Sequence, residues 1–112
     1  VIIRVSDIEL STRWYCEKLG LSVLHQDPIH RLTVLDTSSA TSLTLWQTSE
    51  KIEVRPAAAT YPIFRTIDAR RSHKLLLERG VVVKDVITDH AVTYFTFSDP
   101  DGNMLEACQV HK

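Results

Sequence analysis

One carboxylate stands in a segment whose composition otherwise favours burial. Glu106 lies in the middle of residues 104–110, which are mostly apolar. The turn sequence Asp99-Pro100-Asp101-Gly102 joins this segment to the β-rich, aromatic residues 91–97, which predicts a hairpin. Burying a carboxylate is costly unless a charged or hydrogen-bonding partner meets it. Glu106 is therefore either a tolerated glutamate on a solvated face or a site residue inside a cavity.

The remaining side chains able to do chemistry form no recognisable constellation. The two cysteines lie far apart in no CxxC pattern, which suits buried thiols in a reduced, cytoplasmic protein. Nothing in the sequence pairs a cysteine with a histidine as nucleophile and base. No histidine has HxH or HxxxH spacing to another, so a surface or boundary position is expected for His25, His30, His73, His90 and His111.

Composition limits the function classes. The chain has 112 residues, of which 44% are hydrophobic and 24% charged, with a net charge of −1. This is an ordinary globular balance with no basic patch for nucleic acid. No apolar run approaches the roughly 20 residues of a membrane span. No signal peptide is visible, and the chain begins at Val1, inside an expected strand.

The first part of the chain predicts one helix among four strands. Asp7 is a good N-cap for a helix over residues 8–18, and Gly20 ends it. Turn residues separate the remaining apolar segments. The expected strands are residues 1–5, 21–26, 31–36 and 42–47.

The second part predicts the same order. After a connector at residues 48–60, Asp68 caps a helix over residues 69–79, and Gly80 ends it. Strands are expected at residues 61–67, 81–87, 92–97 and 104–110. We therefore expect a single domain, residues 1–112, with module one at about 1–47 and module two at about 61–112.

Residue identities support an internal repeat. A shift of 61 aligns Ile2 with Ile63 and Asp7 with Asp68. The same shift superimposes further pairs: Arg4 and Arg65, Ser11 and Ser72, and Glu17 and Glu78. Agreement between these identities and the element order predicts an α+β fold of two βαβββ modules.

The hairpin with its glutamate, the repeat, and the opening segments Ile3-Arg4-Val5-Ser6-Asp7-Ile8 and Trp14-Tyr15-Cys16-Glu17-Lys18-Leu19-Gly20-Leu21 resemble the vicinal oxygen chelate superfamily. That superfamily holds glyoxalase I, bleomycin resistance proteins and extradiol dioxygenases. The resemblance covers essentially the whole chain. It implies curled mixed sheets around a cavity, with the helices outside.

The resemblance also implies where a metal would bind. In metal-dependent members a glutamate at the position of Glu106 is a ligand. The position that usually carries histidine falls on Tyr61, and a further glutamate position falls on Thr44. The remaining ligand position falls one residue before Val1. Divalent metals need three or more imidazole or carboxylate donors, so we expect no metal and no other cofactor.

Strand alternation and the repeat together indicate which side chains face the implied cavity. On the strand expected at residues 92–97, the resemblance implies that Tyr94 and Thr96 face inward and that Phe95 and Phe97 lie under the helix. The expected ligand-binding residues are Arg4, Trp46, Tyr61, Arg65, Tyr94 and Glu106. Aromatic walls with a few charges describe a small-molecule pocket. Alternatively, the aromatic residues fill a collapsed core, and the arginines pair with Glu106 or lie in water.

Three functions remain open. The first is a metal-free binder of a small anionic or aromatic molecule, of the bleomycin resistance type. The second is a metal-dependent lyase or dioxygenase of the glyoxalase type, and the third is a structural or regulatory module without a ligand. Because sheet edges need cover and members of the superfamily are commonly homodimers, we expect a homodimer.

Overall fold

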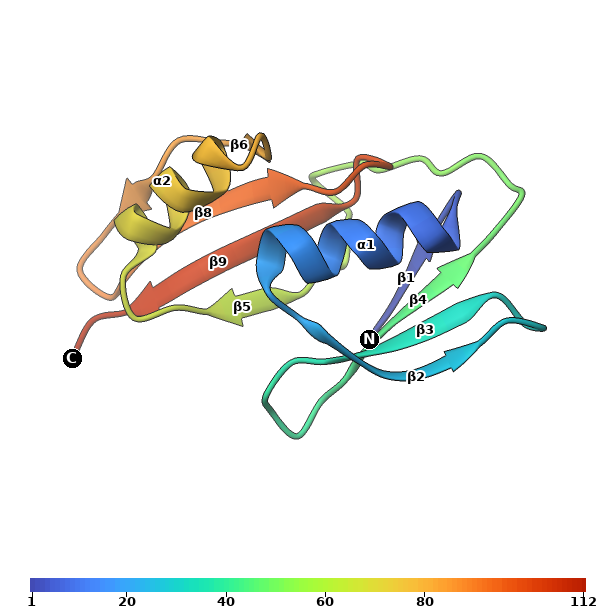
Figure 1. Ribbon diagram of the computed structural model, residues 1–112. Helices are drawn as coiled ribbons and strands as arrows, with labels where there is room; N and C mark the ends of the chain where they lie inside the picture. Colours follow the sequence, from blue (N-terminus) through green and yellow to red (C-terminus); the bar gives the residue numbers. More distant parts are fainter. The chain divides into compact units, whose positions relative to one another are not determined.

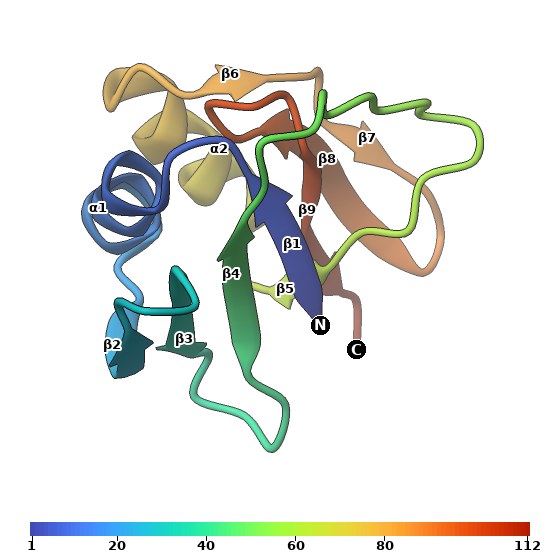
Figure 2. The ribbon, with the colours of Figure 1, turned by 90° about the vertical axis from the view of Figure 1, so that its right-hand side faces the viewer.

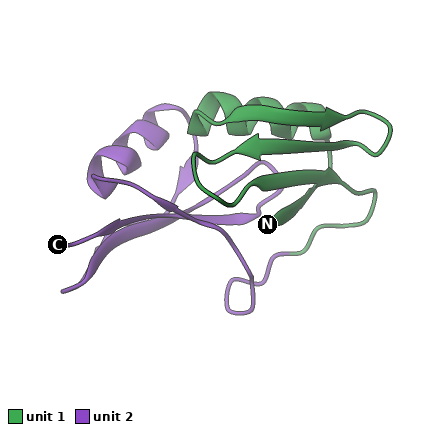
Figure 3. Ribbon diagram, turned by 90° about the horizontal axis from the view of Figure 1, so that it is seen from below, with its two compact units in different colours: residues 1–53 green, residues 54–112 purple.

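The computed structural model describes residues 1–112, which divide into two compact units. Unit 1 comprises Val1–Glu53 and unit 2 comprises Val54–Lys112 (Figure 3). The boundary falls inside the segment expected to be a connector. Neither helix is long and apolar enough to cross a membrane.

Unit 1 is a four-stranded mixed sheet with one helix on it. Its elements are β1 (Ile2–Val5), α1 (Ile8–Leu19), β2 (Ser22–Asp27), β3 (Leu32–Asp36) and β4 (Leu43–Gln47). The strand order is β1-β4-β3-β2, with β1 parallel to β4 and the other pairs antiparallel (Figures 1 and 2). Helix α1 packs on β3 and β4.

Unit 2 repeats this arrangement. Its elements are β5 (Ile63–Arg65), α2 (Ala69–Glu78), β6 (Val82–Val83), β7 (Ile87–Thr88), β8 (Val92–Ser98) and β9 (Met104–Val110). The strand order is β5-β9-β8-β6, and β7 also pairs with β8. The β5–β9 pair is parallel, as β1–β4 is in unit 1. The predicted α+β fold of two βαβββ-like modules is therefore confirmed.

Two predicted strands are shorter than expected. The strand predicted at residues 61–67 covers only Ile63–Arg65, because Pro62 has no N–H for the sheet and contributes only its carbonyl, which accepts from Glu106 N at 3.2 Å. The strand predicted at residues 81–87 is divided into β6 and β7. Between them, Lys84 N donates to Thr96 O at 2.8 Å, but regular pairing is interrupted.

The same hydrogen bonds begin both helices. Asp7 Oδ1 accepts from the second and third backbone N–H groups of α1 at 3.1 Å, and Asp68 Oδ1 accepts from Arg71 N in α2 at 3.1 Å. The first N–H of each helix donates to a glutamine at the end of the module's last long strand. Ile8 N donates to Gln47 Oε1 at 3.0 Å, and Ala69 N donates to Gln109 Oε1 at 2.9 Å. The internal repeat therefore includes the hydrogen bonds that start the two helices as well as the residue identities.

Each sheet buries one face against its own helix. In unit 1 the buried side chains are those of Ile3, Val5, Thr33, Leu35, Leu43 and Leu45, together with Tyr15 and Ser11 of α1. In unit 2 Phe95 and Phe97 lie on the α2 side as predicted, and the Phe95 ring centroid is 5.0 Å from that of His73 in α2. The alternate residues of every strand form what we call the helix-free face of each sheet.

Candidate ligand-binding surfaces

Arg4 and Trp46 meet on the helix-free face of unit 1. They are direct partners in the β1–β4 register, and Arg4 Cζ lies 4.6 Å from the centroid of the Trp46 ring. Arg4 Nη2 also donates to Gln47 O at 3.3 Å. A cation over an aromatic ring at an exposed site contributes about 0.5–1 kcal/mol. The guanidinium of Arg4 is therefore held against the indole and the backbone of β4.

The turn between β2 and β3 fixes the other end of the indole. Trp46 Nε1 donates to His30 O at 3.0 Å. Asp27 Oδ1 accepts from the backbone N–H groups of Ile29 and His30, and Asp27 Oδ2 lies 2.7 Å from His30 Nδ1. These hydrogen bonds, led by that from the His30 backbone, lower the pKa of Asp27. Trp46 is thus a pre-positioned aromatic surface.

Glu106 is buried on the helix-free face of unit 2. It lies in β9 between Ile63 of β5 and Thr96 of β8, and only 8% of it is exposed. Its carboxylate accepts no hydrogen bond and forms no ion pair. Desolvation raises the pKa of Glu106, because burial penalises the charged form. The alternative in which Arg65 pairs with Glu106 is therefore wrong.

Arg65 and Tyr94 lie on either side of Cys108, the next residue of β9 on the helix-free face. Cys108 pairs with Arg65 across the β5–β9 ladder and with Tyr94 across the β8–β9 ladder. Tyr94 is half-buried, whereas Arg65 is exposed and forms no ion pair or hydrogen bond. Burial, with Glu106 and Asp89 as lesser causes, raises the pKa of the Cys108 thiol. An unpaired guanidinium, a phenol ring and an unpartnered carboxyl therefore share one face of unit 2.

The two equivalent arginines have different environments. Residues 46 and 108 occupy corresponding positions in the registers of β1–β4 and β5–β9, but Trp46 has a cysteine as its counterpart. Arg4 consequently has an indole beneath it, and Arg65 does not. Tyr61 is half-buried in the irregular segment before β5, outside the strand in which it was expected. The regular registers of β1–β4 and β5–β9 put Arg4 and Arg65 on the helix-free faces of their sheets.

The donor set does not fit a divalent metal. In unit 1, Thr44 on the helix-free face of β4 supplies a neutral hydroxyl, which is a poor ligand. In unit 2, the carboxyl of Glu106 has no imidazole or second carboxylate with it. Nowhere in the chain do three or more histidine, cysteine, aspartate or glutamate side chains converge.

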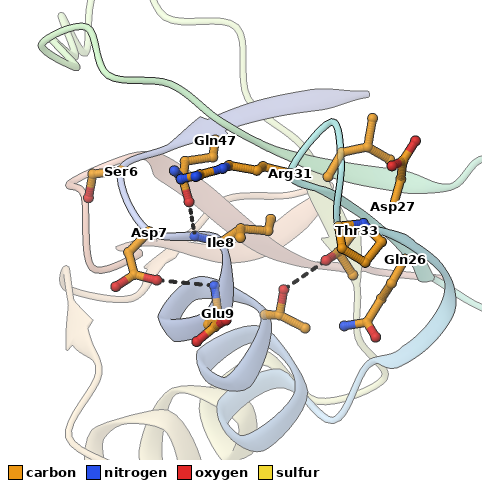
Figure 4. A pocket seen from close by; sticks show the side chains of 12 residues that line it. Ser6, Asp7, Ile8, Glu9, Gln26, Asp27, Arg31, Thr33 and Gln47 are labelled. Carbon is orange, nitrogen blue, oxygen red and sulfur yellow. Dashed lines mark hydrogen bonds between the residues drawn. The ribbon is translucent and has the colours of Figure 1, made fainter.

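Sequence reasoning missed a polar pocket in unit 1. It has a volume of about 630 Å³ and lies between the first turn of α1 and the β2–β3 turn (Figure 4). Arg31 lines it, and the backbone of this residue adopts the left-handed conformation with φ 55°. The sequence signal for this region is the Asp27-Pro28 pair, which indicates a turn. It does not reveal that Arg31 adopts the left-handed conformation, which is uncommon for a residue other than glycine.

Comparison with solved structures places this fold among known proteins. An integron cassette protein from the mobile metagenome of the Halifax Harbour sewage outfall shares 24% identity over 97% of this chain and 94% of its own, with a TM-score of 0.85. A glyoxalase/bleomycin resistance protein/dioxygenase from Alicyclobacillus acidocaldarius shares 18% identity over 100% of this chain and 89% of its own, with a TM-score of 0.81.

A third similar structure has a described role. It is TnmS3, an antibiotic binding protein from Streptomyces sp. CB03234, with 26% identity over 98% of this chain and 93% of its own and a TM-score of 0.73. None of the curated proteins compared with this sequence matches it. The model of the Glyoxalase/Bleomycin resistance protein/Dioxygenase superfamily matches residues 1–107. The chain therefore belongs to that superfamily.

Proposed function

We propose that this protein binds a small anionic, aromatic molecule on the helix-free face of unit 2. The observation that carries the proposal is that Arg65 and Glu106 lie on one face of adjacent strands without neutralising each other. Arg65 is exposed and Glu106 is largely buried, and neither has a protein partner that a ligand would have to displace. The antibiotic binding role of TnmS3 supports small-molecule binding within this fold.

Each group has a distinct task in this proposal. Arg65 binds a carboxylate or phosphate of the ligand through parallel hydrogen bonds, for which a guanidinium is well shaped. Tyr94 packs against an aromatic ring of the ligand. Glu106 exchanges a hydrogen bond with a ligand hydroxyl, and burial raises the pKa of its carboxyl.

Arg4 and Trp46 provide a second surface for the same ligand class in unit 1. The indole is fixed through its Nε1, and the guanidinium above it offers a flat cation on which an aromatic anion can stack. We assign this surface a lesser role because Arg4 is already held by Trp46 and Gln47. Tyr61, half-buried before β5, remains a proposed contact residue.

The test is a thermal-shift screen of small aromatic carboxylates and phosphates, followed by calorimetric titration of the best hit. A hydrogen bond between charged groups contributes about 1.5–3 kcal/mol, so Arg65→Met should weaken binding by roughly tenfold or more. Arg70→Met is the matched control, because Arg70 is exposed on α2, which covers the opposite face. Equal affinities of Arg65→Met and wild type would overturn the proposal.

Two further expectations belong to this function. We propose that binding needs no divalent metal, since Thr44 and Tyr61 stand at positions where metal-dependent relatives carry donors. Elemental analysis showing about one metal per chain, lost in Glu106→Ala, would support the metal-dependent lyase or dioxygenase instead. We also propose a homodimer, because β2 is an edge strand whose Leu24 is 60% exposed. Light scattering at the 12.7 kDa of one chain would contradict this.

A further inference from the structure

The pocket beside α1 has two opposed walls. One wall is the first turn of α1 with Asp7 and Glu9, and the other is the end of β2 with Gln26 and the β2–β3 turn with Arg31 (Figure 4). Gln47, at the end of β4, lies between them. Its volume of about 630 Å³ lies within the range of small-molecule sites. The pocket reaches Thr33, which faces α1, and also Leu32, the β3 partner of Trp46, so it borders the helix-free face of unit 1.

Several polar groups of the pocket are already satisfied. Asp7 caps α1, and Asp27 binds the backbone and ring of His30. Gln47 Oε1 accepts from the first N–H of α1, so the helix start offers no free donor there. Thr12 Oγ1 donates to Thr33 Oγ1 at 3.0 Å. The start of the helix and these paired groups therefore shape the pocket and are not the groups that recognise a ligand.

The groups that remain have opposite charges on opposite walls. Arg31 and Glu9 are both exposed, and neither forms an ion pair. The carbonyl of Arg31 accepts from Gln47 N at 3.0 Å, which fixes the backbone from which the guanidinium extends toward Gln47 (Figure 4). The side-chain amide of Gln26 also has no partner. A ligand able to use both walls must carry both charges.

We propose that this pocket binds a small zwitterion with a carboxylate and an ammonium group, of the free α-amino acid class. Arg31 takes the carboxylate through parallel hydrogen bonds. Glu9 takes the ammonium group, and the Gln26 carbonyl adds an acceptor. Ile8, Pro28 and Leu32 line the pocket and provide apolar contact for a side chain. A simple anion would meet Asp7 and Glu9, and a cation would meet Arg31.

The experiment uses the whole chain, labelled with ¹⁵N, and L-leucine as the probe. Its matched controls are 4-methylpentanoate, which lacks the amino group, and 3-methylbutylamine, which lacks the carboxylate. We expect saturable shifts of the Thr33 backbone amide and the Gln47 side-chain amide with leucine, and at least tenfold weaker effects with either control compound. Equal responses to leucine and to one control compound would overturn the zwitterion assignment.

Variants separate the pocket from the site proposed in unit 2. Arg31→Asn removes the guanidinium while retaining a residue that tolerates the left-handed backbone. We expect it and Glu9→Gln each to weaken leucine binding at least tenfold. Glu17→Gln, an exposed position on the same helix outside the pocket, should have no effect. Arg65→Met should also bind leucine normally, and loss of binding in Glu17→Gln or retention in Glu9→Gln would overturn the proposal.

Discussion

The internal repeat supplies a matched pair of serines whose substitution should have opposite effects on stability. Ser72 Oγ lies 2.7 Å from Thr66 Oγ1 in unit 2. Ser11 occupies the equivalent position in unit 1, but Val5 stands where Thr66 stands. Ser11 is fully buried, and its Oγ has no hydrogen-bond partner. One repeat has therefore kept a hydroxyl whose partner the sequence does not supply.

The expected difference follows from this contrast. Leaving a buried donor unsatisfied costs about 1–3 kcal/mol, so Ser11→Ala should stabilise the protein by roughly 1–2 kcal/mol. Ser72→Ala loses a hydrogen bond worth about 1 kcal/mol. The gain in helix propensity, up to roughly 0.7 kcal/mol, is common to both alanines and cancels in the comparison. The two variants should differ by about 2 kcal/mol, with Ser11→Ala the more stable.

Urea denaturation followed by circular dichroism measures this difference, and amide hydrogen exchange in α1 and α2 assigns it to the correct unit. A third variant sharpens the test. Val5→Thr provides Ser11 with a hydroxyl partner, so it should cost roughly 1 kcal/mol less in the wild type than in the Ser11→Ala background. Equal destabilisation by Ser11→Ala and Ser72→Ala would refute the reasoning.

Three further predictions concern charged and polar groups. Burial raises the pKa of Glu106 in the folded state, so the contribution of this group to folding stability is largest below its unfolded pKa and is lost as pH rises. Glu106→Gln should therefore be more stable than wild type near pH 7. Urea titrations at acidic pH should show no such gain. Hydrogen bonds lower the pKa of Asp27 in the folded state, so the contribution of this group to folding stability is present above its unfolded pKa and is lost as pH falls. Asp27→Asn should therefore lower the urea midpoint near pH 7, but not at the lowest pH where the protein folds. Gln47→Ala and Gln109→Ala should each cost about 0.5–1.5 kcal/mol, and amide exchange should accelerate at the start of that module's helix alone.

Local signals in the sequence were sufficient for most of the fold. Asp7 and Asp68 cap the predicted helices, and Gly20 has the positive φ that its position requires. These features depend on neighbouring residues, so the sequence displays them directly. The division of residues 81–87 into β6 and β7 depends instead on pairing with the distant β8, which periodicity does not reveal.

The candidate site was predictable only in part, for the same reason. Tyr94 and Glu106 lie on one face of the sheet, because pairing in β8 and β9 is regular. Whether Glu106 has a partner depends on the direction of long side chains, and spacing does not determine it. The pocket of Arg31 depends on a turn and a helix start that meet only in the folded unit.

The glutamine contacts at the helix starts have a consequence for how the chain tolerates interruption. Gln47 and Gln109 each accept a hydrogen bond from the first N–H of the helix in their own unit, so neither helix start depends on the other unit for this bond. A protease cut between residues 48 and 60, or new chain ends created there by circular permutation, would remove none of the hydrogen bonds that start either helix. Cleavage, insertion or fusion in the loop after Gln47 should therefore leave the start of each helix intact.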